Sequence, residues 1–171
     1  DDGIEFFGGT VSGKYLVSTG SGDDSIDFAD GWSGTGEYWF INKGTKAGIE
    51  GSNNGDDGNA SPTTTAVLRN ISIVGPGSEG SLYIKEGGGH WTASNIYAAD
   101  FALGIKIKSS DTAANDNVKN GNILITNIQF DNVTKKDEYT GTETYFTEGT
   151  NTGAGNGKNA PTWATGWTIG L

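Results

Sequence analysis

Two hexapeptides that lie 22 residues apart are nearly identical: residues 1–6 are DDGIEF and residues 23–28 are DDSIDF. Internal repetition at this period is typical of a solenoid, a chain that coils on itself so that each repeat stacks on the previous one. The pattern of a small residue followed by an aliphatic residue returns at Ile49, Leu82 and Ile105. The repeat therefore predicts a coiled architecture before any other feature is considered.

The aliphatic residues that mark the repeat are separated by 22, 23, 33 and 23 positions. We interpret the step of 33 as one coil of 23 residues plus an insertion of ten, placed in the polar stretch near 52–64. A second insertion is expected near 110–120, and both would leave the coils as loops. The coils then occupy residues 1–134. Residues 135–171 are rich in Thr, Gly and Asn and would form a cap on the last coil or a link to a further module.

A second repeat begins with asparagine and alternates apolar with polar residues, as a strand with one buried face does. It occurs at Asn70, Asn95 and Asn127. In successive coils these asparagines would stack about 4.8 Å apart and form an amide ladder. In the two earlier coils, the same register brings Lys14 beside Glu37 and Tyr15 beside Tyr38, an opposite-charge pair and an aromatic pair.

Short runs rich in Ile, Val, Tyr, Phe and Trp are bounded by Gly, Asn and Ser, as strands are, and helical periodicity is absent. Strands that repeat in the same direction at a spacing of 22–23 residues are the pattern of a parallel β-helix. The sequence thus predicts an all-β protein, a single-stranded parallel β-helix of five to six coils.

Charge and composition exclude several classes of function. The formal net charge of −10 argues against nucleic acid as a partner, because phosphates require an excess of Lys and Arg. No stretch approaches 18 consecutive apolar residues, so no membrane insertion is expected. The absence of cysteine excludes a disulfide scaffold and a thiolate metal site. Divalent cations are the natural partners of such an acidic surface.

One group of carboxylates could bind such a cation. Glu5, Asp27 and Glu50 each follow the inward isoleucine of their coil, so they should point outward and stack on one face. Asp2 and Asp24 precede them at the corner. Hard oxygen ligands in a row suit Ca²⁺, which accepts six to eight of them with flexible geometry. The alternative is a solvated acidic ladder without an ion.

Aromatic residues form a second candidate site. Trp32 and Tyr38, with Tyr15 one coil away, could form a platform on which sugar rings of a polysaccharide stack. The alternative is that some members of this group fill the core.

Four segments carry a resemblance to a known family: residues 2–11 (DGIEFFGGTV), 23–25 (DDS), 30–32 (DGW) and 70–75 (NISIVG). They resemble a repeat region of large secreted bacterial surface proteins and lipoproteins that are predicted to be right-handed β-helices. The similarity covers residues 1–75 well and the rest loosely. It implies a right-handed β-helix and an extracellular or cell-surface location, and it supplies no catalytic residues because the family has no established activity.

The first functional hypothesis is a non-catalytic extracellular structural protein. The chain starts inside its first repeat, so the first coil would present unpaired backbone groups to another chain. Head-to-tail self-association of this kind produces open filaments.

The second hypothesis is a calcium-dependent polysaccharide-binding or polysaccharide lyase domain. Lyases with this fold typically pair calcium-held acidic groups with a basic residue, and Arg69 or Lys85 would be the candidates. The only histidine, His90, follows three glycines and is interpreted as a turn residue. If Arg69 or Lys85 clusters with the acidic ladder on one face, this second hypothesis is favoured. Wide separation favours the structural role.

Overall fold

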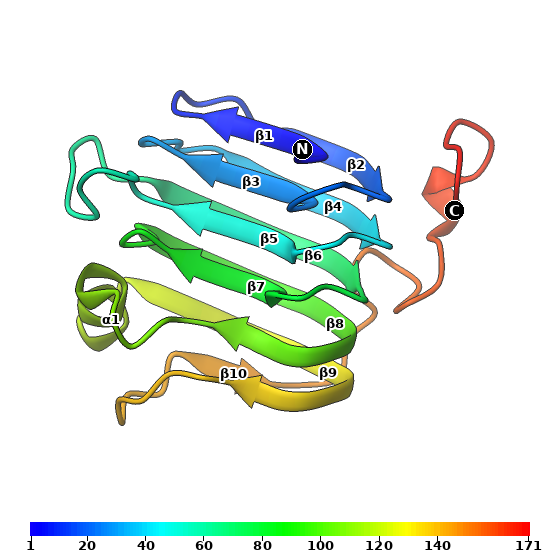
Figure 1. The fold of residues 1–171 in the computed structure, drawn as a ribbon. Coiled ribbons are helices and arrows are strands. Elements are labelled where there is room, and N and C mark those ends of the chain that lie inside the picture. Colours follow the sequence, from blue (N-terminus) through cyan, green and yellow to red (C-terminus); the bar gives the residue numbers. More distant parts are fainter.

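The computed structural model describes residues 1–171, and nearly all of its regular structure is parallel β-sheet. A first row of strands runs down one side of the molecule (Figure 1). It comprises β1 (Ile4–Phe7), β3 (Ile26–Ala29), β5 (Ala47–Ser52) and β7 (Gly80–Lys85), and the end of β8 continues it. The second row comprises β2 (Gly13–Thr19), β4 (Thr35–Asn42), β6 (Thr65–Val74), β8 (His90–Lys106), β9 (Ile123–Asp137) and β10 (Phe146–Glu148).

The register of the first row is the one that the repeat predicts. Ile4 pairs with Ile26, Ile26 with Ile49, Ile49 with Leu82, and Leu82 with Ile105. The chain alternates between the two rows, so each passage through both rows stacks on the previous one, as in a β-helix. The prediction of an all-β fold with parallel strands is therefore confirmed.

The asparagine repeat forms the amide ladder that the sequence predicts. Asn95 Nδ2 donates to Asn70 Oδ1 at 3.0 Å, and Asn127 Nδ2 donates to Asn95 Oδ1 at 2.7 Å. All three residues have φ between 55° and 56°, the left-handed region that asparagine tolerates better than most residues. They lie where the long strands β6, β8 and β9 bend, so the ladder holds the bends of successive coils in register.

We expect Asn95→Ala to lower the free energy of unfolding by about 2–3 kcal/mol. The substitution removes two amide hydrogen bonds of about 1 kcal/mol each and leaves an alanine in the left-handed region. Asn95→Gly is the matched control, because glycine loses the same hydrogen bonds without the backbone strain and should lose less stability. Denaturant unfolding measures both variants, and wild-type stability in both would contradict a role for the ladder.

The space between the two rows holds one continuous apolar core. Trp32, Trp39 and Trp91 are fully enclosed in it, together with the inward isoleucines of both rows. Small residues make room for these rings: a side chain at Gly51 would collide with the indole of Trp91 and the ring of Phe28. The narrow core explains how a chain with a hydrophobic share of only 33% can fold as a solenoid.

The second insertion differs from the expected loop. Residues Thr112–Lys119 form a short helix, α1, whose N-terminus is capped by Asp111. The helix packs through Ala114 and Val118, one turn apart on the same face. Between β5 and β6, by contrast, the first insertion forms a loop without regular structure.

The C-terminal residues follow a path that the sequence does not predict. β10 pairs with β9 and so continues the second row beyond residue 134. The remaining residues, 149–171, then run back along the flank of the rod to its first coils (Figure 1). Asn151 Nδ2 donates to the Asn127 carbonyl at 2.7 Å, and Trp163 packs against Tyr15 with ring centroids 5.2 Å apart. Residues 149–171 therefore lie along the flank of the rod.

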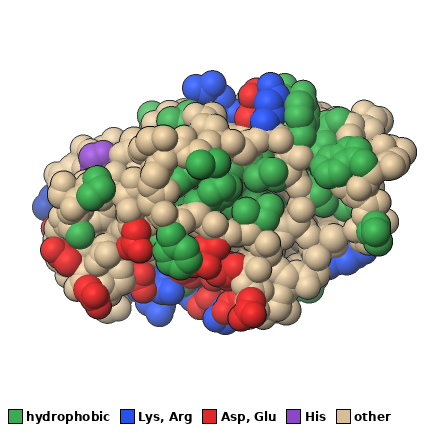
Figure 2. Space-filling model, turned by 90° about the horizontal axis from the view of Figure 1, so that it is seen from above, with side chains coloured by type: hydrophobic (Ala, Val, Ile, Leu, Met, Phe, Trp, Pro, Cys, Tyr) green, Lys and Arg blue, Asp and Glu red, His purple; other side chains and the backbone are tan.

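No helix is both long and apolar enough to cross a lipid bilayer. Seen from above the first coil, acidic and basic side chains gather along one edge of the molecule, with a smaller charged group at the opposite edge, and hydrophobic side chains form separate patches (Figure 2).

Candidate functional site

A cleft of about 300 Å³ opens on the outer face of the first row. Because alternate residues of a strand point to opposite faces, the residues after the inward aliphatic ones line up here in a column. The strand register gives this column as Glu5, Asp27, Glu50, Tyr83 and Lys106. The column changes from acidic to basic along the rod, so the cleft has an acidic end and a basic end.

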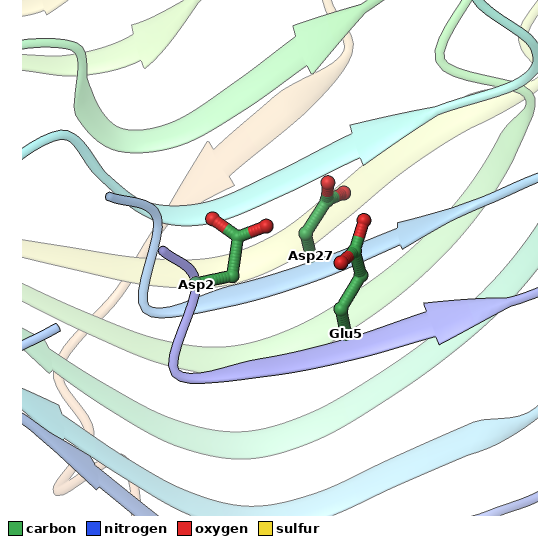
Figure 3. A group of neighbouring side chains, drawn as sticks. All are labelled: Asp2, Glu5 and Asp27. Atoms are coloured by element: carbon green, nitrogen blue, oxygen red, sulfur yellow. The ribbon is translucent and has the colours of Figure 1, made fainter. Parts of the chain in front are cut away.

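The acidic end brings carboxylates from two successive coils together. Asp2, Glu5 and Asp27 have oxygens within 4.8 Å of one another. They come from the segment before β1, from β1 and from β3, and their carboxylates point toward one another (Figure 3). Hydrogen bonds fix the corner beside them: Asp2 Oδ1 accepts from the Asp24 amide at 2.9 Å, and Asp24 Oδ1 accepts from the Ala47 amide at 2.6 Å.

A second carboxylate group lies next to the first. Asp24, Glu50 and Glu79 also have oxygens within 4.8 Å of one another, and both Asp24 and Glu50 are buried. All five carboxylates that the sequence singled out thus lie in two adjoining groups. Such a set of hard oxygen donors could hold a divalent cation.

Sequence reasoning missed Asp23, Lys46 and Glu79, which also line the cleft. The signal was present in the repeat itself. Each of these residues lies three positions before the inward aliphatic residue of its coil, in the column that Asp1 begins. Extending the repeat alignment by one position toward the N-terminus of each coil would have found them.

Burial and mutual repulsion raise the pKa values of two carboxyl groups at the acidic end. Desolvation, and then the negative charges of Glu50, Asp2 and Glu5, raise the pKa of Asp27 to about 8. Burial also raises the pKa of Glu50 to about 7, even though Lys85 favours its charged form. Asp27 Oδ1 is shielded from solvent and has no hydrogen-bond partner. A cation at this position would supply the missing partner and the missing positive charge.

Lysines dominate the other end of the cleft. Lys85 Nζ lies 2.9 Å from Glu50 Oε1, and Lys106 Nζ lies 2.8 Å from Glu79 Oε1. Lys106 also lies 4.3 Å from the ring centroid of the buried Tyr83, and Lys108 lies 5.7 Å from it. Positive charge and a phenol ring therefore face the space beside the carboxylates.

Of the basic residues considered in the sequence, only Lys85 lies in the cleft, and Arg69 and His90 lie elsewhere. Lys85 lies in the cleft, paired with Glu50 of the acidic ladder. Burial alone would lower the pKa of Lys85, but its hydrogen bond with Glu50 and the nearby carboxylates outweigh this and raise it. Arg69 lies in β6, where it pairs in register with Glu37, and His90 begins β8. Neither residue lines the cleft.

The prediction that Trp32 contacts a glycan is wrong. Its side chain is fully buried, with its ring centroid 5.1 Å from that of Phe6 and 5.0 Å from that of Phe28. The preceding residues, Asp30 and Gly31, both have positive φ, and the tight corner that they form turns the indole into the core. Trp32 Nε1 donates to the Val11 carbonyl at 2.8 Å, so its polar atom is also satisfied internally.

Tyr15 and Tyr38 lie side by side on the second row, as their register predicts. Their rings stack with centroids 5.2 Å apart, and Tyr15 is 44% exposed. Lys14 and Glu37 form the expected ion pair beside them, with Lys14 Nζ 3.1 Å from Glu37 Oε2.

The parallel rows, their register and the ladder define the chain as a parallel β-helix with a polar cleft on one face. The chain matches the model of the pectate-lyase-like β-helix domain family over residues 1–168, and it therefore belongs to that family. Searches of curated proteins and of solved structures found no match.

We expect the stability of the protein, measured in chelator, to fall as the pH rises from about 4 to about 8. The pKa of Asp27 is about 8 in the native state, compared with an ordinary value of about 3.9. The native state therefore holds a proton that the unfolded state has released across this range, and the free energy of unfolding decreases. Denaturant unfolding at several pH values tests this. Asp27→Asn should flatten the dependence, and a wild-type stability that rises with pH would contradict it.

Proposed function

We propose that this domain binds an acidic polysaccharide in the cleft without cleaving the polysaccharide, and that Ca²⁺ is held at the acidic end. The observation that supports this proposal best is the position of Lys85. It lies with Glu50 and Asp27 in one cleft, and the sequence hypothesis named this clustering as the sign of a polysaccharide site. A polysaccharide-related role also agrees with membership of a pectate-lyase-like family.

The acidic end has the chemistry that calcium requires. Asp2, Glu5 and Asp27 offer oxygens within 4.8 Å of one another, and Asp24 and Glu50 lie beside them. Calcium accepts many oxygen ligands at flexible angles, and sugar hydroxyl or carboxylate oxygens can complete its shell. Binding would displace the proton of Asp27, since the cation favours the charged carboxylate.

The basic end favours an anionic sugar. Lys108 is exposed at the rim and has no carboxylate in ion-pair contact, whereas Lys85 and Lys106 are paired. A carboxylate on the polysaccharide could therefore bind Lys108 while neighbouring oxygens complete the calcium shell. The two ends of the cleft would then recognise successive parts of one acidic chain.

The protonation state of Lys85 supports binding without catalysis. A base that removes a proton from a sugar ring must be unprotonated at the working pH. The raised pKa of Lys85 keeps it charged, and Arg69 lies outside the cleft. Neither Lys85 nor Arg69 is therefore a suitable base for the lyase reaction in this cleft.

A glycan array probed in calcium and in chelator tests the proposal. We expect binding to uronate-containing glycans in calcium and loss of that binding in chelator. An assay for unsaturated sugar products, which absorb ultraviolet light, should remain negative. Calcium-independent binding to the same glycans, or no binding to any acidic glycan, would overturn the proposal, and a positive product assay would overturn its non-catalytic part.

We also propose a right-handed β-helix of five to six coils and an extracellular or cell-surface location, as in the bacterial surface proteins that residues 1–75 resemble. The unbroken register from Ile4 to Ile105 and its continuation to Asp137 support the number of coils. Secretion in a bacterial host, followed by cell fractionation, tests the location.

End-to-end assembly is a second candidate function. Phe7 is 69% exposed and Val11 is 66% exposed along the edge that β1 and β2 form. An edge with apolar side chains is a template for a second chain. Electron microscopy at micromolar concentration tests this candidate: filaments that disappear in Phe7→Lys support it, whereas discrete wild-type rods exclude it.

A further inference from the structure

One bend position changes its residue type along the β-helix. In β6, β8 and β9 the left-handed residue is asparagine, whereas in β2 and β4 it is Tyr15 and Tyr38, with φ of 58° and 55°. Asparagine tolerates this conformation, but a bulky aromatic residue is an outlier there. Backbone strain that persists at a pair of which one ring, that of Tyr15, is exposed points to a role for these side chains beyond folding.

The C-terminal segment adds two indole rings to this pair. The ring centroid of Trp163 lies 5.2 Å from that of Tyr15, and the ring of Trp167 stacks on Trp163 at 6.2 Å with an interplanar angle of 25°. Trp167 remains 58% exposed. These four aromatic residues form a continuous surface, which we call the aromatic patch: Tyr15, Tyr38, Trp163 and Trp167.

The patch is held in place by hydrogen bonds to backbone carbonyls, and Tyr15 and Trp167 remain exposed within it. Trp163 Nε1 donates to the Ala154 carbonyl at 2.8 Å, and Trp167 Nε1 donates to the Trp163 carbonyl at 2.7 Å. Lys43 Nζ donates to the Gly170 carbonyl at 2.8 Å, which fixes the end of the segment. The indoles are therefore positioned in advance, and a ligand would lose little conformational freedom of the protein on binding.

Polar groups border the aromatic faces. Lys14 Nζ, which forms an ion pair with Glu37, lies 5.3 Å from the ring centroid of Tyr15 and 5.5 Å from that of Tyr38. The two charges of this pair compensate each other, so the border offers donors and acceptors without a net charge. Apolar ring faces with a few polar groups are the usual composition of a small-ligand site.

We propose that the aromatic patch binds the pyranose rings of a neutral polysaccharide, independently of calcium. A pyranose presents an apolar face of C–H groups and a rim of hydroxyls, which match the exposed rings of Tyr15 and Trp167 and a polar border without net charge. The patch lies on the second row, whereas the acidic cleft lies on the first. The proposal therefore does not depend on the function of the cleft.

A purely structural role explains only part of the patch. Trp163 and Tyr15 together could serve to dock the C-terminal segment onto the second row. Docking does not require Trp167, whose ring remains mostly exposed, nor does it require a strained tyrosine at the bend. Trp167 is therefore the residue at which sugar binding and docking can be separated.

The test is a titration of wild-type protein with soluble neutral β-glucan and β-xylan oligosaccharides in chelator, followed by tryptophan fluorescence and calorimetry. We expect Trp167→Ala and Tyr15→Asn each to weaken binding by about tenfold or more, the loss of one stacking ring. Tyr15→Asn installs the residue that later coils use at this bend, so it should keep or raise the melting temperature. Ile169→Ala is the matched control, since Ile169 is 92% exposed in the same segment but is not aromatic.

Each outcome bears on the proposal. The proposal is supported if the wild type binds in chelator and Trp167→Ala and Tyr15→Asn weaken this binding. Ile169→Ala and Asp27→Asn should preserve it. No wild-type binding to any neutral glycan overturns it, and so does binding that the aromatic variants leave unchanged. A concentration-dependent dimer that Trp167→Ala abolishes, in the absence of sugar binding, would assign the patch to self-association and also overturn it. Loss of acidic-glycan binding in the cleft would leave these results unaffected.

Discussion

Replacement of Trp32 by alanine should lower the free energy of unfolding by about 3–5 kcal/mol, the range for deletion of a large aromatic ring from a packed core. The side chain has no exposed surface, and its indole packs against Phe6 and Phe28. The substitution also removes the indole N–H that donates a hydrogen bond to the Val11 carbonyl. Chemical denaturation monitored by circular dichroism measures the change.

A matched control is available for this prediction. Ile169 is 92% exposed, so Ile169→Ala should change the stability by less than about 0.5 kcal/mol. If Trp32→Ala instead retained wild-type stability and lost affinity for a glycan, the buried position of Trp32 would be contradicted and the original prediction from the sequence would be restored.

Calcium should stabilise the protein by about 2–3 kcal/mol when its concentration is a hundredfold above the dissociation constant. This gain arises because the cation binds the native arrangement of Asp2, Glu5 and Asp27, which the unfolded chain lacks. Asp27→Asn should be more stable than wild type in chelator at neutral pH and above, because it removes a poorly solvated carboxyl from among other carboxylates. The same variant should lose most of the calcium-dependent gain.

Thermal unfolding in calcium and in chelator measures both effects. Asp56→Asn is the matched control: it makes the same change of charge in the exposed loop between β5 and β6, away from the cleft. It should leave the gain from calcium intact. An equal response of the wild type and Asp27→Asn to calcium would contradict binding at this group, and an unchanged melting temperature of the wild type would exclude a stabilising calcium site.

The strand rows could be predicted from the sequence because one coil of a solenoid contacts only its neighbours. A repeated residue such as Ile26 then has its own equivalents, Ile4 and Ile49, as its spatial partners. The same reasoning predicted the amide ladder and the gathering of five carboxylates on one face. The ladder and the column of Glu5, Asp27 and Glu50 follow from register and from the two-residue alternation of strands, whereas Asp2 and Asp24 join the column from the preceding corner.

Features outside the strands could not be predicted in this way. Trp32 lies in a corner after two residues with positive φ, where the alternation of a strand does not apply. Helix α1 has only eight residues, too few for its periodicity to stand out, although Asp111 is a suitable N-cap. The path of residues 149–171 depends on single contacts such as that of Trp163 with Tyr15, which no repeat encodes.

Calorimetric titration with an oligogalacturonate tests the proposed role of the cleft most directly. The proposal predicts that the wild type binds the oligosaccharide in calcium but not in chelator. Asp27→Asn should lose this binding, and Asp56→Asn should retain it. Binding of equal affinity in chelator, or in Asp27→Asn with calcium present, would contradict a calcium-dependent polysaccharide site among Asp2, Glu5 and Asp27.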